Sequence, residues 1–190
     1  MEPALRDRWG RILLGVGLAV LSISFGQYGF MLMRQWQMRA RWTGAVTLSR
    51  TAAADPRRLR LIIPRIQLDD VVVRGTNYMD LLVAPGLLNG TPPPGPRGNT
   101  VIAGHRDTFF RNVAQLRDGD RIRLESAGSE YGYRVTGVRI VAPTDTAPLV
   151  QTAEPQLTLV TCYPTYWIGP APKRLIVRAA LESVRPLSVP

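Results

Sequence analysis

A run of uncharged, mostly apolar residues near the N-terminus constrains this chain more than any other feature. Residues 12–33 read ILLGVGLAVLSISFGQYGFMLM and contain no Asp, Glu, Lys or Arg. As a helix rising ~1.5 Å per residue, this run is roughly 33 Å long, enough to cross the hydrocarbon core of a bilayer. A buried core helix is the alternative, but a helix so uniformly apolar is unusual in a small soluble domain. We therefore predict a transmembrane helix at residues 12–33.

The flanks of this run distinguish a retained anchor from a cleaved signal peptide. The apolar part of a signal peptide is usually about 7–15 residues long, with a small-residue cleavage site soon after it. Here RQWQ follows directly at 34–37, and the alanine-rich stretch at 52–54 lies too far along the chain. We expect a retained anchor, with a short cytoplasmic segment at 1–11 and a juxtamembrane linker at 34–58.

The charge of the chain is strongly basic, with 24 Lys+Arg against 14 Asp+Glu and a net charge of +10. The basic residues are dispersed and no nucleic-acid-binding motif accompanies them, so we predict no nucleic-acid partner. A basic stretch beside an anchor is better explained by anionic lipid headgroups. Three arginines precede the apolar run and four follow it within about 20 residues, so the charge count leans slightly against a cytoplasmic N-terminus.

From residue 59 onward, the sequence changes to short apolar runs that are typical of strands. The runs cover residues 59–63, 71–73, 100–103, 121–125, 131–141, 157–161 and 175–181. Gly and Pro separate them, most densely in TPPPGPRGN at 91–99, which no helix or central strand would accommodate. This spacing predicts an all-β domain over residues 59–190, closed or sandwiched, with short helical candidates only at 79–84 and 109–116.

The chain has one cysteine and one histidine, which limits the chemistry available to it. An internal disulfide and a zinc site of the usual Cys/His kind are both excluded. Cys162 and His105 each follow an expected strand, where functional groups usually sit. A thiol needs a neighbouring cation or base to become a useful thiolate, and an imidazole provides either. A lone cysteine is otherwise explained as a small buried hydrophobe.

Arg174 lies twelve residues after Cys162 and opens the next expected strand. A connection of that length returns the chain antiparallel, which would place Arg174 close to Cys162. A guanidinium in that place could stabilise a developing oxyanion or hold the backbone of a substrate. The plainer interpretation is a solvated charge at the edge of a sheet.

Two segments around these residues carry a specific resemblance. TLVTCYP at 158–164, followed by Arg174, resembles the TLxTC…R signature of the sortases, a family of cysteine transpeptidases of cell surfaces. GNTVIAGHR at 98–106 is similar to the strand of that family that carries the catalytic histidine. IIPRI at 62–66 and LRDGD at 116–120 also resemble sortase segments. The resemblance runs from about residue 59 to 181 and is strongest to class D.

The resemblance implies an eight-stranded β-barrel and a defined role for each candidate residue. Cys162 would attack the Thr carbonyl of an LPxTG-like sorting signal and hold the product as a thioester. His105 would act as general acid for the leaving amine and then as base for the incoming one, while Arg174 would stabilise the oxyanion. Thr161 and Tyr163 would contact the substrate.

The same resemblance implies the partners and the location of the domain. The partners would be surface proteins that carry the sorting signal, and an amine acceptor on a cell-wall precursor or a pilin lysine. The catalytic domain would face the outside of the cell membrane.

We predict no metal and no cofactor. Asp69 with Asp70, and Asp118 with Asp120, form acidic pairs that lack the ligand spacing of a calcium loop. Asp107 is expected to cap the turn after His105 rather than to act on the imidazole. The loop at 163–172 is a candidate to control access of water and amine to the thioester; the alternative is aromatic packing over the barrel mouth.

Two other classes of cysteine enzyme fit these residues less well. L,D-transpeptidases resemble an S-x-G-C-x-R pattern, which the residues around Cys162 do not match. Papain-like enzymes place Cys before His, whereas His105 precedes Cys162 here. The remaining alternative is a membrane-anchored, non-catalytic β-barrel that serves as a binding or scaffold module, with an inert buried Cys162.

Overall fold

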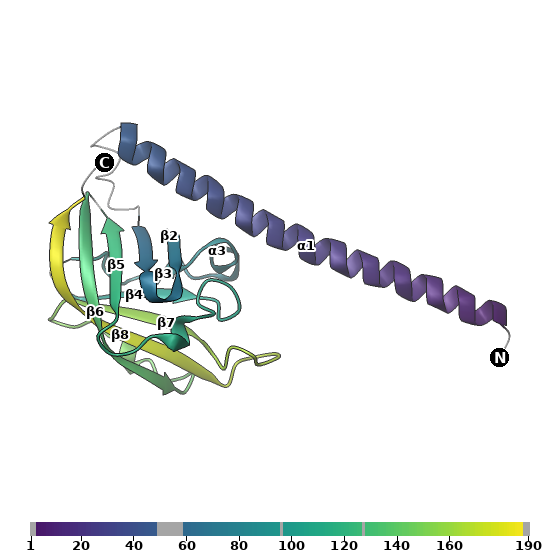
Figure 1. Ribbon diagram of the computed structural model, residues 1–190. Coiled ribbons are helices and arrows are strands. Elements are labelled where there is room, and N and C mark those ends of the chain that lie inside the picture. The colour runs from purple at the N-terminus through teal and green to yellow at the C-terminus, as the bar shows by residue number, and fades with distance from the viewer. Residues whose placement is uncertain (1–2, 49–58, 96, 127, 188–190) are drawn as a thin grey trace.

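A single long helix followed by a barrel of strands makes up the chain (Figure 1). The structure is a computed structural model that describes residues 3–48, 59–95, 97–126 and 128–187. The strands are β1 (Leu59–Ile63), β2 (Leu68–Arg74), β3 (Gly86–Leu87), β4 (Asn99–Gly104), β5 (Arg121–Ser126), β6 (Ser129–Val141), β7 (Gln156–Tyr163) and β8 (Lys173–Pro186). The helices are α1 (Pro3–Leu48), α3 (Tyr78–Val83) and the 3-10 turns η1 (Pro64–Ile66), η2 (Val113–Gln115) and η3 (Ala147–Leu149).

The strands close into a barrel in the order β1-β2-β3-β4-β7-β8-β6-β5, with β5 pairing back onto β1. This confirms the prediction of an all-β, eight-stranded barrel with few helices after an N-terminal apolar helix. Most neighbouring strands are antiparallel, but β2 pairs with β3 and β4 pairs with β7 in parallel. The β4–β7 pairing matters most for function, because it brings together the ends of two strands that are distant in the sequence.

Alternating apolar side chains fill the inside of the barrel. Leu61, Ile102, Leu124, Leu157 and Val177 are completely buried, and each comes from a different strand. Burying an aliphatic side chain of this size contributes about 1.5–3 kcal/mol, so these side chains stabilise the closed barrel. The largest fully buried side chains are aromatic and lie in the same core.

The expected elements and the observed ones agree, with one strand missed. The runs that predicted strands all lie within observed strands, and the two helical candidates overlap α3 and η2. The missed strand, β3, has only two residues, and these pair with Ala103 and Ile102 of β4. Two residues are too short for an alternating pattern, so only the pairing itself identifies this strand.

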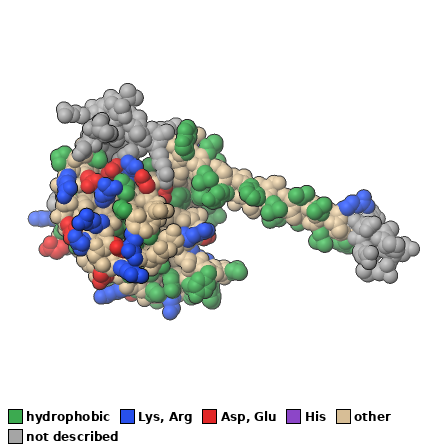
Figure 2. Space-filling model, in the orientation of Figure 1, with side chains coloured by type: hydrophobic (Ala, Val, Ile, Leu, Met, Phe, Trp, Pro, Cys, Tyr) green, Lys and Arg blue, Asp and Glu red, His purple; other side chains and the backbone are tan. Residues whose placement is uncertain are grey.

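Helix α1 continues well beyond the predicted anchor. Its segment Trp9–Gln37 is 29 residues long and has a mean hydropathy of 1.6, so it is long and apolar enough to cross a membrane. The rest of the chain buries none of its most apolar stretch. Figure 2 shows hydrophobic side chains along it. The predicted linker is helical as far as Leu48, and its remainder at 49–58 lies outside the described residues. The division of the chain at residues 11, 33 and 58 stays a prediction.

Gln35 joins α1 to the barrel domain. Its side chain is 6% exposed, and Nε2 donates a hydrogen bond to the carbonyl of Val83, at the end of α3, at 2.9 Å. This part-buried hydrogen bond links the helix to the domain.

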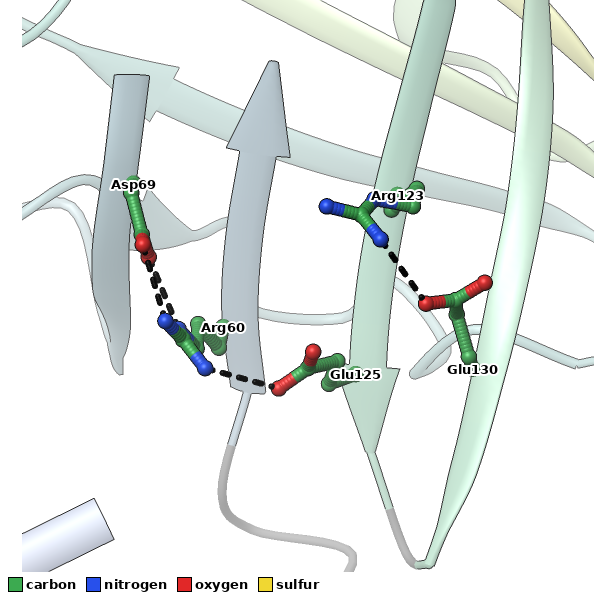
Figure 3. A network of polar contacts seen from close by, with 5 residues as sticks. All are labelled: Arg60, Asp69, Arg123, Glu125 and Glu130. Atoms are coloured by element: carbon green, nitrogen blue, oxygen red, sulfur yellow. Dashed lines mark hydrogen bonds and ion pairs between the residues drawn. The ribbon is translucent and has the colours of Figure 1, made fainter. Parts of the chain in front are cut away.

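An arginine-centred network covers part of the outer surface of the barrel (Figure 3). Arg60 in β1 donates two hydrogen bonds to Asp69 in β2, at 2.7 and 2.8 Å, and one to Glu125 in β5 at 3.3 Å. The Asp69 carboxylate, and to a smaller extent Glu125, raises the pKa of Arg60 above its ordinary value. Arg123 and Glu130 pair in the same way across β5 and β6, at 3.3 Å. These pairs tie neighbouring strands together on the outside.

Candidate active site

The ends of β4 and β7 place His105 and Cys162 side by side. In the parallel register, Ile102 lies opposite Leu159 and Gly104 lies opposite Thr161. The next residues along the two strands are His105 and Cys162. Neighbouring strands of a sheet are about 4.7–4.9 Å apart, so the imidazole and the thiol leave adjacent stretches of backbone.

Arg174 completes this arrangement from the other side of β7. It is the residue directly opposite Cys162 in the antiparallel β7–β8 pair. Leu175 and Val177 of β8 are buried in the barrel, so the alternation places Arg174 on the outer face. Side chains directly opposite each other lie on one face, with Cβ atoms about 4.5–5.5 Å apart. The structure thus brings His105, Cys162 and Arg174 into one row across three neighbouring strands.

The three side chains of this row are accessible but not fully exposed. His105, Cys162 and Arg174 are all half-buried, and Cys162 is a free thiol. A cysteine in the core of the barrel would be enclosed as Leu157 and Leu159 are in the same strand. Cys162 is therefore not placed as an inert core residue would be.

The turn after β4 determines where His105 lies. The main-chain nitrogen of Phe110 donates a hydrogen bond to the carbonyl of His105 at 3.0 Å, so residues 105–110 fold back over the strand end. The Phe110 ring then covers Gly104: a Cβ added to that glycine would lie 2.7 Å from ring carbons. The ring of Tyr78, from α3, meets the imidazole edge-on, with centroids 6.1 Å apart and planes at 64°.

The Thr161 side chain is buried at the strand end, and its contact with substrate stays a prediction. It is 3% exposed, and its hydroxyl donates a hydrogen bond to the carbonyl of Gly104 at 2.7 Å. The alternation along β7 turns this side chain inward, away from the face that carries Cys162. Its observed role is to fasten β7 to β4 beside the two reactive residues. Tyr163 is half-buried and packs against the hydrophobic core.

The guanidinium of Arg174 is held by the backbone of its own loop. Nη1 donates hydrogen bonds to the carbonyls of Ala171 at 3.3 Å and Lys173 at 3.0 Å. A guanidinium has five N–H donors in a planar fork, so these two bonds orient it and leave donors for a bound carbonyl or oxyanion.

Arg106 is a structural residue of the site that the sequence alone did not single out. Its Nη1 donates to the carbonyl of Pro164 at 3.2 Å, and its Nη2 donates to those of Trp167 at 2.8 Å and Gly169 at 2.9 Å. These bonds tie the loop after Cys162 to the residue after His105. Its position next to the histidine is the only sequence signal, and it does not predict the three acceptors.

The loop between β7 and β8 does not pack over the barrel mouth. Tyr166 is 84% exposed, Trp167 47% and Ile168 97%. The alternative of aromatic packing is therefore wrong for the tip of this loop. Its part in controlling access to Cys162 stays a prediction.

A cavity of about 600 Å³ lies between α1 and the turn after His105. Its lining includes Tyr28, Leu32 and Gln35 of α1 and Phe109 and Arg111 of the turn. This cavity thus lies beside the reactive row rather than over it. Asp107, expected to cap this turn, also lines the cavity and accepts two hydrogen bonds from Arg111 through its main-chain carbonyl, at 3.1 and 2.9 Å.

One carboxylate of each of the two acidic pairs has an arginine partner. Asp69 pairs with Arg60, and Asp120 pairs with Arg65 at 3.1 Å while accepting a hydrogen bond from the main-chain nitrogen of Arg117. Within residues 3–48, 59–95, 97–126 and 128–187, no three His, Cys, Asp or Glu side chains are grouped as metal ligands.

Fold and site together define a class of protein: a β-barrel whose strand ends present a thiol, an imidazole and a guanidinium in one row. A thiol beside an imidazole and a guanidinium is an arrangement suited to cysteine-dependent acyl transfer. Residues 61–182 match the family model of the sortase domain. The chain belongs to the sortase family.

Named relatives agree with this assignment. Sortase D of Bacillus subtilis is 37% identical over 118 residues, which cover 62% of this chain and 60% of that protein. Sortase A of Bacillus anthracis is 31% identical over 107 residues, covering 54% of this chain and 50% of that protein. The chain thus matches about half to three fifths of the length of these curated relatives, and identity is higher to the class D protein.

Solved structures show the same fold. A Clostridium perfringens Sortase D5 transpeptidase superposes with a TM-score of 0.70 at 24% identity, covering 80% of this chain and 99% of that one. The catalytic domain of Bacillus anthracis SrtD has a TM-score of 0.59 at 32% identity, covering 69% of this chain and 90% of that one.

Proposed function

We propose that this protein is a membrane-anchored cysteine transpeptidase that cleaves an LPxTG-like sorting signal between Thr and Gly and transfers the acyl group to an amine. The observation that carries the proposal is the row of His105, Cys162 and Arg174 across β4, β7 and β8. Membership of a family of transpeptidases supports it.

In the proposed reaction, Cys162 is the nucleophile and His105 moves the proton. The Cys162 thiolate attacks the Thr carbonyl, and the tetrahedral intermediate collapses as the C–N bond to Gly breaks. His105 gives its proton to the leaving amine, which leaves a thioester on Sγ. An incoming amine then attacks the thioester, His105 takes up the amine's proton, and the thiolate is released. Both half-reactions balance without an oxidant or a metal.

Arg174 is proposed to stabilise the negative charge that develops on the carbonyl oxygen. Its hydrogen bonds to Ala171 and Lys173 hold the guanidinium in place before substrate arrives. Preorganised donors are effective because they need not rearrange in the transition state.

The location and partners follow from α1 and from the family. The span Trp9–Gln37 would hold the domain at the outer face of the cell membrane. The acyl donors would be surface proteins with a sorting signal, and the acceptor would be an amine on a cell-wall precursor or a pilin lysine.

Intact-mass measurement on the full-length protein in detergent micelles tests the reaction. The protein is incubated with a panel of LPxTG-type peptides that vary at x, with and without triglycine, and compared with Cys162→Ala. We expect an acyl adduct on the wild type only, and a triglycine-ligated product from it. A folded wild-type protein that forms no adduct with any peptide, and whose Cys162 resists alkylation, would instead support the non-catalytic scaffold.

Replacing Arg174 by Lys tests the oxyanion role. Lysine keeps the charge but not the planar fork, so we expect kcat/KM to fall about 10²–10³-fold, the effect of losing one oxyanion donor. The thermal midpoint should stay near that of the wild type. Arg121→Lys, at an exposed position in β5, is the matched control and should retain full activity. Equal kinetics for the two variants would remove Arg174 from the mechanism.

A further inference from the structure

We propose that the tip of the β7–β8 loop, Tyr166, Trp167 and Ile168, docks into the surface of the bilayer that α1 crosses. The inference rests on the membrane anchor proposed above, but not on transpeptidation. Three consecutive large apolar side chains are exposed here, at 84%, 47% and 97%. A contiguous apolar group of this kind in water is unfavourable and marks a binding surface.

The loop is held in an extended position, so its tip is not free to fold back onto the barrel. The three hydrogen bonds from Arg106 fix the carbonyls of Pro164, Trp167 and Gly169, which lie before, within and after the tip. Gly169 has φ of +90°, a conformation that L side chains rarely adopt, and it reverses the chain there. The tip therefore presents its side chains outward from a fixed base.

The direction of the loop identifies a lipid bilayer as the partner. In Figure 1, the loop that joins β7 to β8 projects from the barrel on the side toward which α1 runs to its N-terminus. Figure 2 shows hydrophobic side chains at the end of this projection and along α1. The part-buried Gln35–Val83 hydrogen bond holds the helix against the domain, so a membrane around α1 would meet the loop as well.

The composition of the tip fits the interfacial region of a membrane. Trp and Tyr are enriched at the headgroup level, where one end of the ring is apolar and the other can form hydrogen bonds. Residues 163–173 contain no Asp or Glu, and the exposed Lys173 follows the tip. An exposed cation beside apolar anchors favours a surface with anionic lipids.

Docking would turn the reactive row toward the membrane. Cys162 lies in β7 one residue before the strand end, and Arg174 is the second residue of β8, so both stand at the base of the loop. A peptide segment that leaves the bilayer near α1 would reach this edge of the barrel without crossing the domain.

Site-specific fluorescence on the full-length protein in vesicles tests the docking. Cys162→Ala removes the single thiol, and an environment-sensitive probe is then attached to Ile168→Cys or, as the matched control, to Val150→Cys. Val150 is 61% exposed and lies in the connection that enters β7, at the opposite end of that strand. The vesicles contain phosphatidylcholine and phosphatidylglycerol, with a quencher attached near the headgroup of a fraction of the lipids.

Four outcomes separate the possibilities. Docking predicts a blue-shifted probe at 168 that the lipid quencher reduces severalfold more than the probe at 150, at every protein-to-lipid ratio. Equal, water-like signals at 168 and 150 in protein that floats with the vesicles would overturn the docking and leave the anchor intact. Shielding at 168 that disappears on dilution would show a protein partner instead. Failure of the protein to float would overturn the anchor, and the docking with it.

Discussion

Arg106 illustrates how one side chain can organise a site without taking part in chemistry. Its guanidinium reaches carbonyls that are 58 to 63 residues further along the chain, and it thereby couples the segment after His105 to the segment after Cys162. Hydrogen bonds from a charged donor are stronger than neutral ones, about 1.5–3 kcal/mol each, and all three act on the same loop. The loop between β7 and β8 owes its shape to this residue.

Arg106→Ala should therefore loosen the loop without unfolding the barrel. We expect the main-chain amides of residues 165–171 to exchange hydrogen at least about tenfold faster. A free-energy change of about 1.4 kcal/mol corresponds to a factor of ten in the opening equilibrium, and losing even one hydrogen bond of this strength supplies that change. The measurement is hydrogen exchange followed by mass spectrometry. Arg111→Ala is the control, since the Arg111 guanidinium donates to the carbonyl of Asp107 within its own turn rather than to the β7–β8 loop. Unchanged exchange in the Arg106 variant would contradict the role of Arg106 in holding the β7–β8 loop.

At the scale of elements, the packing of β4 against the turn after it requires a glycine at position 104. Gly104 lies opposite Thr161, and the Phe110 ring occupies the space that a Cβ would need. The Thr161 hydroxyl bonds to the Gly104 carbonyl from the other strand. The position of His105 thus depends on close packing between a strand end, its turn and the neighbouring strand.

Gly104→Ala should displace the Phe110 ring and the turn that carries His105. We expect a loss of about 1–3 kcal/mol in the free energy of unfolding, the usual effect of overpacking, and a fall in transfer activity larger than the loss of stability explains. Urea unfolding and peptide-transfer rates measure the two effects. In Gly137→Ala, the added Cβ meets nothing within 4 Å, so this control should change stability by no more than about 0.5 kcal/mol. Identical behaviour of the two variants would show that the packing over Gly104 is not restrictive.

At the scale of the whole molecule, closure of the barrel buries a titratable group in its core. Tyr133 in β6 is 1% exposed, and burial is the main cause that raises its pKa above the ordinary value of 10.0, with nearby Tyr131 contributing in the same direction. The folded state therefore holds the phenol proton more tightly than the unfolded chain does. The stability that Tyr133 contributes is fully present below the pKa of tyrosine in the unfolded chain, and it is lost as the pH rises above that pKa.

This linkage predicts that the barrel weakens in alkali above about pH 10, by up to about 1.4 kcal/mol per pH unit from this one group. The urea midpoint of the wild type should fall as the pH rises through that range, and that of Tyr133→Phe should fall less steeply. Tyr166→Phe, at an 84% exposed position in the β7–β8 loop, is the comparison and should keep the wild-type slope. Parallel curves for all three proteins would mean that Tyr133 does not carry the alkaline transition.

The local sequence determines most of the secondary structure of this protein. The uncharged run at 12–33 predicted a helix with the length of a membrane span, and alternating apolar runs predicted seven of the eight strands. Periodicity and hydrophobicity act over a few residues, so they are readable without knowing the fold. Local sequence also indicated the candidate site. Cys162 and His105 each stand at the end of an apolar run, and short motifs surround them.

Only the tertiary structure decided how these parts meet. The parallel pairing of β4 with β7 brings His105 beside Cys162, and no local pattern specifies which strands pair. The inward direction of Thr161 and the reach of Arg106 depend on the same pairing. The exposure of the loop tip depends on what the closed barrel leaves uncovered. Contacts between distant segments form only when the whole chain packs, because their energies come from burial and from partners that the local sequence does not contain.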